Sequence, residues 1–327
     1  MKWFAAEMHC HTVHSDGNFT PAQLAASARE FGLDAFCLTD HNTVSGREGI
    51  QAEAAKNGLC VLPGTEWTTY FGHMLVQGCV SCLDWEAVSK DTQEEFIPLI
   101  QRAGGVVGPA HPFRPGNPFG TGCHWEYRIR NWDCFDFYEV LSGENPARRY
   151  YNQRALAHWT SLLDQGCKIA PTSGIDWHRP LLEGAVYAST WLGVSGELTP
   201  EAMREALKRG CTAVSTGPLP LVSAFENGEE HYPGETVPPG PAEIRLAADL
   251  DRRGEIWRKW QIIPREWRIA GPGGEILYRL PFREGRPQTA LLPSMPLWCR
   301  AELFGDVQGE EALIALTSPF YRGTSKA

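Results

Sequence analysis

Six histidines stand at or just beyond the carboxyl end of a predicted β-strand, and this placement limits how the chain can fold. They are His9, His11, His41, His73, His111 and His178. Three acids stand in the same places, Asp16 in HSDG, Glu66 in PGTE and Asp176 in GIDWH. In β/α barrels and open α/β sheets this end of the strands carries the active site. The pattern therefore favours a fold that brings these strand ends together.

Short apolar runs alternate with helix-like segments over the first two thirds of the chain. Thr20-Pro21-Ala22-Gln23 predicts a helix start with a capping box, and so does Thr92-Gln93-Glu94-Glu95. Thr199-Pro200-Glu201 is a third predicted start. Strands that are separated by helices indicate βα units, a largely parallel sheet and an arrangement compatible with a barrel.

The composition and the hydrophobic pattern of the sequence change after about Pro218. From there, Gly and Pro punctuate short apolar runs, as in HYPGETVPPGPAE. Alternation such as Ile244-Leu246-Ala248 is typical of half-buried strands. We predict a first domain over residues 1–217 and a small antiparallel, sandwich-like β domain over residues 218–327.

Charge and hydropathy limit the partners of this protein. The formal net charge is −9, and no basic tract is present to neutralise the phosphates of a nucleic-acid polymer. No run approaches the roughly 20 apolar residues that span a bilayer, and the N-terminal sequence does not resemble a signal peptide. We expect a cytoplasmic protein that acts on a small molecule and has no membrane or nucleic-acid partner. The oligomeric state stays open.

The spacing of the histidines and acids suits metal ligation. In His9-Cys10-His11 the two-residue period of a strand puts both imidazoles on one face, and Asp176-Trp177-His178 repeats this pattern. Nitrogen and oxygen donors favour zinc, manganese or iron. Nine donors exceed the needs of one tetrahedral ion, so we predict two or three divalent ions. Taken alone, Glu66 could be an acid at a helix entry and Asp16 an ordinary turn aspartate.

The order of the motifs resembles the PHP (polymerase and histidinol phosphatase) domain. The resemblance rests on separated segments that cover about residues 1–217. These are His9-x-His11-Thr12-x-x-Ser15-Asp16-Gly17, Thr39-Asp40-His41-Asn42, Gly64-Thr65-Glu66, Gly72-His73, Ala110-His111-Pro112 and Ser173-Gly174-Ile175-Asp176-Trp177-His178. Arg209–Pro218 and Ala315–Tyr321 are more loosely similar to the CehA/McbA-type branch, which joins a PHP domain to a C-terminal β domain.

This resemblance implies a distorted seven-stranded β/α barrel with up to three metal ions. The first ion would be held by His9, His11, Glu66 and Asp176. The second would be held by His73, His111 and a bridging Glu66, and the third by Asp16, His41 and His178.

Such a centre points to a metal-dependent hydrolase, and phosphate esters are the substrates that we expect. In this hypothesis a hydroxide that bridges two ions attacks phosphorus. The same cluster could instead hydrolyse a carboxyl ester, a carbamate or an amide. A non-catalytic metal-binding module is the third alternative.

Three further residues are candidates for catalytic roles. Asp40 could orient a ligand imidazole or cap its loop, and Glu139 could line the pocket or accept a hydrogen bond from a ligand. Arg114, like Arg148 and Arg179, could bind a phosphate or merely face solvent.

Overall fold

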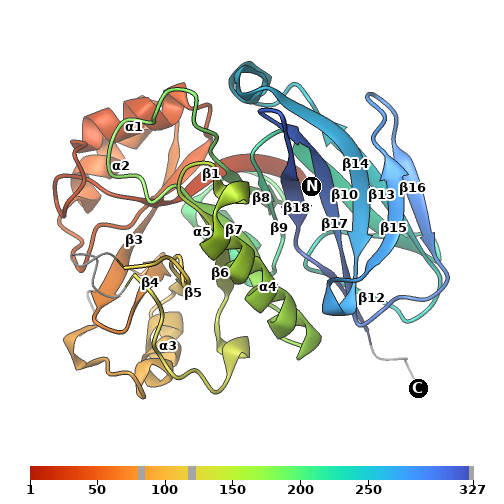
Figure 1. The fold of residues 1–327 in the computed structure, drawn as a ribbon. Coiled ribbons are helices and arrows are strands. Elements are labelled where there is room, and N and C mark those ends of the chain that lie inside the picture. Colours follow the sequence, from red (N-terminus) through yellow and green to blue (C-terminus); the bar gives the residue numbers. More distant parts are fainter. Residues whose placement is uncertain (80–84, 117–122, 324–327) are drawn as a thin grey trace.

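The computed structural model describes residues 1–79, 85–116 and 123–323 and shows a mixed α/β fold (Figure 1). Helices gather around the strands of the N-terminal two thirds, and strands dominate the C-terminal third, drawn in blue. The helices are α1 (Pro21–Glu30), α2 (Arg47–Lys56), α3 (Gln93–Arg102), α4 (Tyr150–Asp164), α5 (Pro200–Lys208) and α6 (Gly254–Trp257). Within the described ranges, no helix is both long enough and apolar enough to cross a lipid bilayer.

One large sheet runs through both parts of the chain. Within the described residues thirteen strands belong to it, and eleven of them form a continuous hydrogen-bonded path. In spatial order the path is β12 (Thr236–Val237), β19 (Phe320–Arg322), β17 (Trp298–Val307), β18 (Glu310–Thr317), β9 (Thr212–Ser215), β8 (Ser189–Val194), β1 (Lys2–Cys10), β2 (Ala35–Leu38), β3 (Cys60–Thr69), β4 (Gly72–Gln77) and β5 (Val106–Pro109). The remaining two are β14 (Ile262–Ala270), which pairs with β17, and β15 (Ile276–Pro281), which pairs with β14.

The prediction of a largely parallel sheet is wrong, because parallel and antiparallel pairs both occur in it. The pairs β1–β2 and β2–β3 are parallel, as is the separate pair of β6 (Phe137–Ser142) and β7 (Ala170–Gly174). The pairs β1–β8, β3–β4, β4–β5 and β8–β9 are antiparallel. Only Tyr70 and Phe71 connect β3 to β4, and so short a connection can join only antiparallel strands.

The expected seven-stranded barrel is not closed by strand ladders in the described part of the chain, although single backbone hydrogen bonds join Asp136 to Val107 and Trp177 to His9. The β6–β7 pair forms a sheet of its own, although β6 contacts β5 and β7 contacts β1 and β9. The β6–β7 pair therefore packs against the large sheet, but strand pairing does not continue from one sheet to the other.

All three predicted helix starts are confirmed, and two of them also have the side-chain caps of helix N-termini. Thr20 forms a full capping box with Gln23 at the start of α1, and the Thr199 side chain accepts a hydrogen bond from the backbone N–H of Ala202 in α5. The capping box predicted at Thr92 is wrong. Its hydroxyl instead accepts a hydrogen bond from the preceding chain, at the N–H of Ser89.

A second sheet covers the C-terminal strands of the large one. Its order is β11 (Glu229–His231), β10 (Leu219–Glu226), β13 (Ala242–Asp249) and β16 (Gln288–Leu292). In β13 the side chains of Ile244 and Leu246 are buried, and they belong to one apolar cluster with Trp267 and Leu303 of the large sheet. The division at residue 217 stays a prediction, and the large sheet continues across it through the β9–β18 pair.

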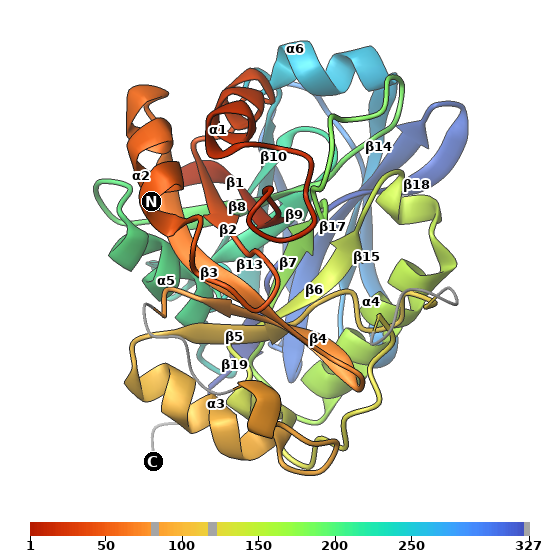
Figure 2. The same ribbon diagram turned by 90° about the vertical axis from the view of Figure 1, so that its left-hand side faces the viewer.

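The short helix α6 brings the C-terminal part back to the N-terminal strands. Figure 2 shows α6 next to α1 at one end of the molecule. A Cβ atom placed on Gly32, just after α1, would lie 2.9 Å from Cδ1 of Ile256 in α6. Gly32 has a φ of +69°, so both its backbone conformation and this close approach favour glycine.

Candidate metal centre

The structure brings all nine predicted ligands together. His9 and His11 lie at the end of β1, His41 follows β2, Glu66 lies in β3, and His111 follows β5. Asp176 and His178 follow β7, and Asp16 lies in the loop after His11. We call these nine residues the candidate metal cluster: His9, His11, Asp16, His41, Glu66, His73, His111, Asp176 and His178.

His73 differs from the expectation, because it lies at the start of β4 and not at a strand end. It still reaches the cluster for a simple reason. Strand β4 runs antiparallel to β3, so the start of β4 lies at the same edge of the sheet as the end of β3, and Thr68 pairs with His73 in register.

The carboxylate of Glu66 occupies the middle of the cluster and is completely buried. Its Oε2 lies 2.9 Å from Nε2 of His9, 3.3 Å from Nε2 of His11 and 3.2 Å from Nδ1 of His41. Its Oε1 lies 2.9 Å from Nδ1 of His73 and 3.2 Å from Nε2 of His111. Burial alone would raise the pKa of Glu66, but the surrounding imidazoles lower it well below its usual value.

Three groups of donors are compact enough to hold one ion each. In each group the donor atoms lie within 4.8 Å of one another. The groups are His9, His11, Glu66 and Asp176; His11, Asp16, His41 and His178; and His41, Glu66 and His73. The first group is the set that the family resemblance implies, and the second adds His11 to the implied set of Asp16, His41 and His178. The third group has His41 where the resemblance implies His111.

Three buried donor atoms of the cluster lie close to one another or to Glu66 but form no hydrogen bond in the described chain, as is expected of metal ligands. Neither ring nitrogen of His11 forms a hydrogen bond within the described chain, and Oδ1 of Asp176 forms none either. His11 is completely buried. Since buried polar atoms are nearly always hydrogen-bonded, these donors fit a site for divalent cations.

Backbone conformation is unusual beside the cluster. His111 has a φ of +28°, Asp176 of +56° and Asn42, next to His41, of +51°. Non-glycine residues rarely adopt such values, and they concentrate at functional sites where the surrounding structure holds them.

The outer part of the cluster has strongly displaced pKa values. Burial lowers the pKa of His178, but its hydrogen bond to Asp16 and the charge of Asp176 outweigh this and raise it to about 9. Burial raises the pKa of Asp16, but His178 and His41 lower it to about 2. Burial lowers the pKa of His41 to about 4. Perturbed groups that share one cleft are typical of functional sites.

Glu139, a predicted site residue, supports the cluster from β6. Its Oε2 lies 2.9 Å from Nδ1 of His9, and its Oε1 accepts a hydrogen bond from the backbone N–H of His111. Glu139 is therefore placed to orient two candidate ligands, as carboxylates beside metal-bound histidines usually do.

Asp40 caps its loop. Its carboxylate accepts hydrogen bonds from the backbone N–H and the hydroxyl of Thr12, both at 2.7 Å, and from the hydroxyl of Ser15 at 2.8 Å. These bonds hold the segment between His11 and Asp16. Of the two roles considered for Asp40, the contacts favour loop capping over orientation of an imidazole.

Glu7 is a supporting residue that the sequence analysis missed. It is completely buried, and its Oε1 accepts hydrogen bonds from the N–H of His9 at 2.9 Å and of Ile175 at 2.8 Å. Burial raises the pKa of Glu7 to about 8. Its role could have been predicted from its position two residues before His9, because the two-residue period of a strand places both side chains on the same face of β1.

A cavity of about 380 Å³ opens beside the cluster. Its wall includes Asp176, His178, Arg114 and Arg179, and Arg114 forms an ion pair with Asp176. Arg148 points elsewhere, to the carbonyl of Val307 at 2.6 Å. Two of the three arginines considered from the sequence therefore lie at this cavity.

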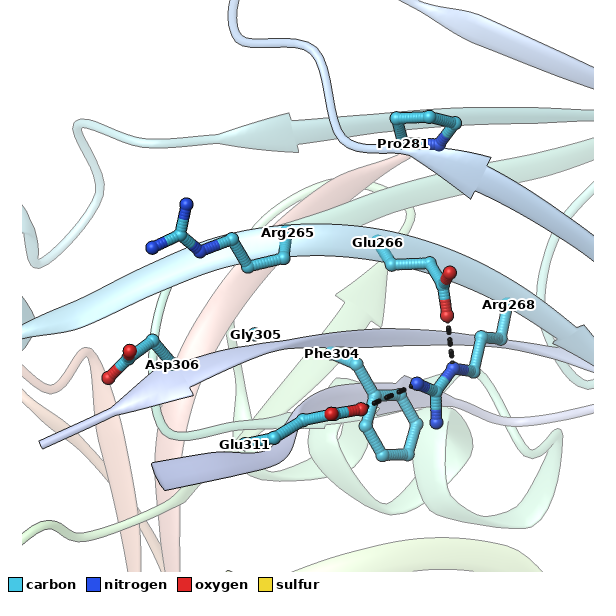
Figure 3. A pocket seen from close by; sticks show the side chains of 8 residues that line it. All are labelled: Arg265, Glu266, Arg268, Pro281, Phe304, Gly305, Asp306 and Glu311. Atoms are coloured by element: carbon cyan, nitrogen blue, oxygen red, sulfur yellow. Dashed lines mark hydrogen bonds and ion pairs between the residues drawn. The ribbon is translucent and has the colours of Figure 1, made fainter. Parts of the chain in front are cut away.

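A further cavity, of about 400 Å³, lies on the C-terminal strands and has a different character (Figure 3). Its Arg268 forms ion pairs with Glu266 and Glu311. None of the predicted site residues lines it. This cavity therefore contains none of the candidate metal ligands.

Comparison with known proteins finds one family whose profile matches part of the chain. Residues 7–107 match the profile of the PHP domain. A 5'-3' exoribonuclease of Haemophilus influenzae is 32% identical over 63 residues, which cover 19% of this chain and 23% of that protein. An uncharacterised protein of Methanocaldococcus jannaschii is 27% identical over 122 residues, which cover 34% of this chain and 68% of that protein. The match thus spans about a quarter of the length of the exoribonuclease.

A solved structure from Bacteroides vulgatus is similar along nearly the whole chain. It is described as a two-domain protein containing a predicted PHP-like metal-dependent phosphoesterase. The superposition covers 96% of this chain and 95% of that one, with a TM-score of 0.56 and 15% sequence identity. The two chains therefore share a fold.

Proposed function

We propose that this chain, whose residues 7–107 match the profile of the PHP domain, is a metal-dependent phosphoesterase that acts on a small phosphorylated molecule. The observation that carries this proposal is the convergence of nine imidazole and carboxylate side chains around the buried Glu66. Divalent ions bound there would lower the pKa of a water molecule and neutralise charge on a phosphoryl group.

In this proposal the residues divide into ligands and supports. His9, His11, Glu66 and Asp176 would hold the first ion. Glu66, His73 and His111 would hold the second, and Asp16, His41 and His178 would hold the third. Glu139 orients His9, and Asp40 holds the loop that carries Asp16. Zinc, manganese and iron all suit these donors.

Arg114 is placed to assist substrate binding. It lies on the cavity wall beside Asp176, and a guanidinium carries five N–H donors, of which the ion pair with Asp176 uses only part. We infer that Arg114 both fixes this candidate ligand and donates to a phosphoryl oxygen. Because phosphoryl transfer depends mainly on positioning and electrostatics, such a donor contributes directly to catalysis.

Elemental analysis combined with paired assays tests the proposal. The purified protein should hold at least two divalent ions per chain, and chelation followed by addition of manganese or zinc should abolish and then restore hydrolysis of p-nitrophenyl phosphate. The variant Glu66→Gln should lose both metal and activity. Glu311→Gln is the matched control, because its side chain is exposed and lies at the remote cavity.

The same assays separate the alternatives. Hydrolysis of a naphthyl ester or carbamate without phosphatase activity would replace the phosphoesterase by a carboxyl-ester or carbamate hydrolase. Release of nucleotides from a short RNA would extend to this chain the activity named for its exoribonuclease relatives. Activity that survives complete chelation would overturn the proposal.

A further inference from the structure

The ring of His41 is held by a hydroxyl group of the neighbouring strand. Its Nδ1 forms a hydrogen bond with Oγ1 of Thr68, which lies in β3. Thr68 follows Glu66 by two residues, so the two-residue period of a strand places both side chains on one face of β3, toward the cluster. Thr68 therefore contacts a candidate ligand directly without being one of the nine.

The hydrogen bonds of Thr68 determine which nitrogen of His41 carries the hydrogen. The hydroxyl of Thr68 has one hydrogen and donates it to the backbone carbonyl of Glu66 at 3.2 Å, so toward His41 it can only accept. The other group beside Nδ1 is Oε2 of Glu66 at 3.2 Å, and an ionised carboxylate also only accepts. In a neutral His41 this network assigns the hydrogen to Nδ1 and leaves the lone pair on Nε2.

Nε2 of His41 faces the outer part of the cluster. It lies 3.5 Å from Oδ1 of Asp16, and the same oxygen lies 3.0 Å from Nε2 of His178. These three residues belong, with His11, to one of the compact donor groups. The hydrogen bond from Nδ1 to Thr68 thus directs the free lone pair of His41 toward that group.

Asn42 fixes the position of Thr68. Its Oδ1 accepts a hydrogen bond from the backbone N–H of Thr68, and its Nδ2 donates to the carbonyl of Thr68, both at 2.9 Å. The backbone N–H of Asn42 donates to the carbonyl of Glu66 at 3.0 Å. Asn42 has a φ of +51°, a conformation that asparagine adopts more readily than most residues. Three hydrogen bonds therefore hold the segment that carries His41 in register with β3.

We propose that Thr68 is a positioning residue of the candidate metal centre, which fixes the His41 ring with Nε2 toward Asp16 and is itself held by Asn42. The inference rests on the proposed metal-binding function and concerns its outer site. Without the hydroxyl, Nδ1 of His41 keeps only Oε2 of Glu66, which is itself a candidate ligand. Replacing a group that orients a ligand histidine commonly weakens metal affinity by about 10–100-fold.

The variant Thr68→Val tests this role in the full-length protein, because valine has nearly the same shape but accepts no hydrogen bond. Zinc and manganese per chain are counted after dialysis against a fixed concentration of free metal, and affinities are measured by competition with a chelator. The affinity for one ion should fall by about 10–100-fold, while the other ions stay bound. Thr68→Ser keeps the hydroxyl and should retain most of the affinity.

A second substitution tests whether Asn42 acts through Thr68. Asn42→Gly removes the amide but tolerates the positive φ. It should weaken the same ion in the wild-type background and have little further effect in the Thr68→Val background. Equal losses of affinity in both backgrounds would contradict the role given to Asn42.

The matched control is Thr65→Val, the same change in the same strand but on the face opposite to Glu66 and Thr68. It should leave the number and affinity of the bound ions unchanged. Unchanged binding in Thr68→Val, or an equal loss in Thr68→Ser, would overturn the inference. If Thr68→Val does not fold, as judged by thermal melts, Thr68→Ala is compared with Thr68→Ser. A wild type that binds the ions but hydrolyses no phosphate ester would refute the proposed reaction alone, because these measurements do not use activity.

Discussion

His9 shows how a single imidazole is prepared for ligation. Its Nδ1 faces Glu139 at 2.9 Å, while its Nε2 faces Glu66 at 2.9 Å and Asp176 at 3.3 Å. A neutral His9 that donates from Nδ1 to Glu139 presents the lone pair of Nε2 to the cluster. Burial opposes protonation of His9, but the three carboxylates raise its pKa well above its usual value. Bound metal must therefore displace a proton here.

Glu139→Gln should weaken metal binding without unfolding the protein. The amide keeps an acceptor near Nδ1 of His9 but lacks the negative charge that makes Nε2 a strong donor. We expect affinity for zinc to fall by about 10–100-fold, measured by chelator competition. Glu144→Gln serves as the control, because Glu144 is half-exposed and paired with Arg149. Unchanged affinity in Glu139→Gln would show that Glu139 does not act on the metal site.

Metal affinity should rise with pH up to about pH 9, the pKa that Asp16 and Asp176 give to His178 against the effect of burial. A protonated imidazole cannot bind a cation, so protons compete with metal below that value. In the metal-free protein the stability of the fold changes in the opposite direction and falls as the pH rises. The raised pKa means that the His178–Asp16 pair stabilises the fold fully below about pH 6.5 and loses this contribution as the pH rises through about 9. Competition titrations measure the affinity over this pH range, and thermal melts of the metal-free protein measure the stability. An affinity independent of pH would contradict the first effect, and a melting temperature that does not fall towards pH 9 would contradict the second.

At the scale of secondary-structure elements, the buried pair of Arg300 and Glu302 connects β17 with α4. Arg300 is 3% exposed and Glu302 is 5% exposed. Arg300 donates to Glu302 at 2.8 Å and to the hydroxyl of Thr160 in α4 at 3.0 Å, and it lies over the rings of Trp159 and Trp298. The pair therefore joins a helix of the N-terminal part to a C-terminal strand.

Arg300→Met should destabilise the protein by about 3–5 kcal/mol, because it leaves the carboxylate of Glu302 buried without its partner. The double variant Arg300→Met/Glu302→Leu should recover most of this loss, since it removes both charges. Chemical denaturation of the three proteins measures the effect. A single variant as stable as the wild type would mean that water reaches Glu302.

The sequence predicted best those features that are set by local pattern. The HxH motif of β1 and the DWH motif after β7 place their ligands by strand periodicity, and the structure brings both to the cluster. Strand direction was predicted poorly, because the β3–β4 hairpin looks like two more strands of a parallel sheet. Glu7 was missed, since its role depends on a contact with Ile175, which is far away in the sequence.

At the scale of the whole molecule, the β9–β18 pair joins the two predicted domains into one sheet. Ala315 pairs with Ser215 and Thr317 with Ala213. Apolar side chains from both sides of residue 217 share one cluster, including Trp3, Phe31, Trp257 and Trp267. The two parts therefore stabilise each other by backbone hydrogen bonds and by apolar burial.

A fragment of residues 1–217 should not fold to a native state. It would leave β9 without β18 and expose apolar side chains that the C-terminal strands cover. We expect weak near-UV circular dichroism, binding of the dye ANS and no tight metal site, with the full-length chain as the control. A soluble fragment with a cooperative melt and normal metal affinity would show that residues 1–217 are an independent domain.

The pairing of β9 with β18 also means that the large sheet cannot be completed until late in the synthesis of the chain. The ribosome completes β9 at Ser215 and reaches β18 only at Glu310, about 95 residues later. At roughly 5–20 residues per second, this takes on the order of 5–20 s, during which β9 has no β18 to pair with. An open strand edge invites pairing with other chains. Crowding of ribosomes on one messenger RNA would therefore favour aggregation of this protein during translation, before the large sheet has formed.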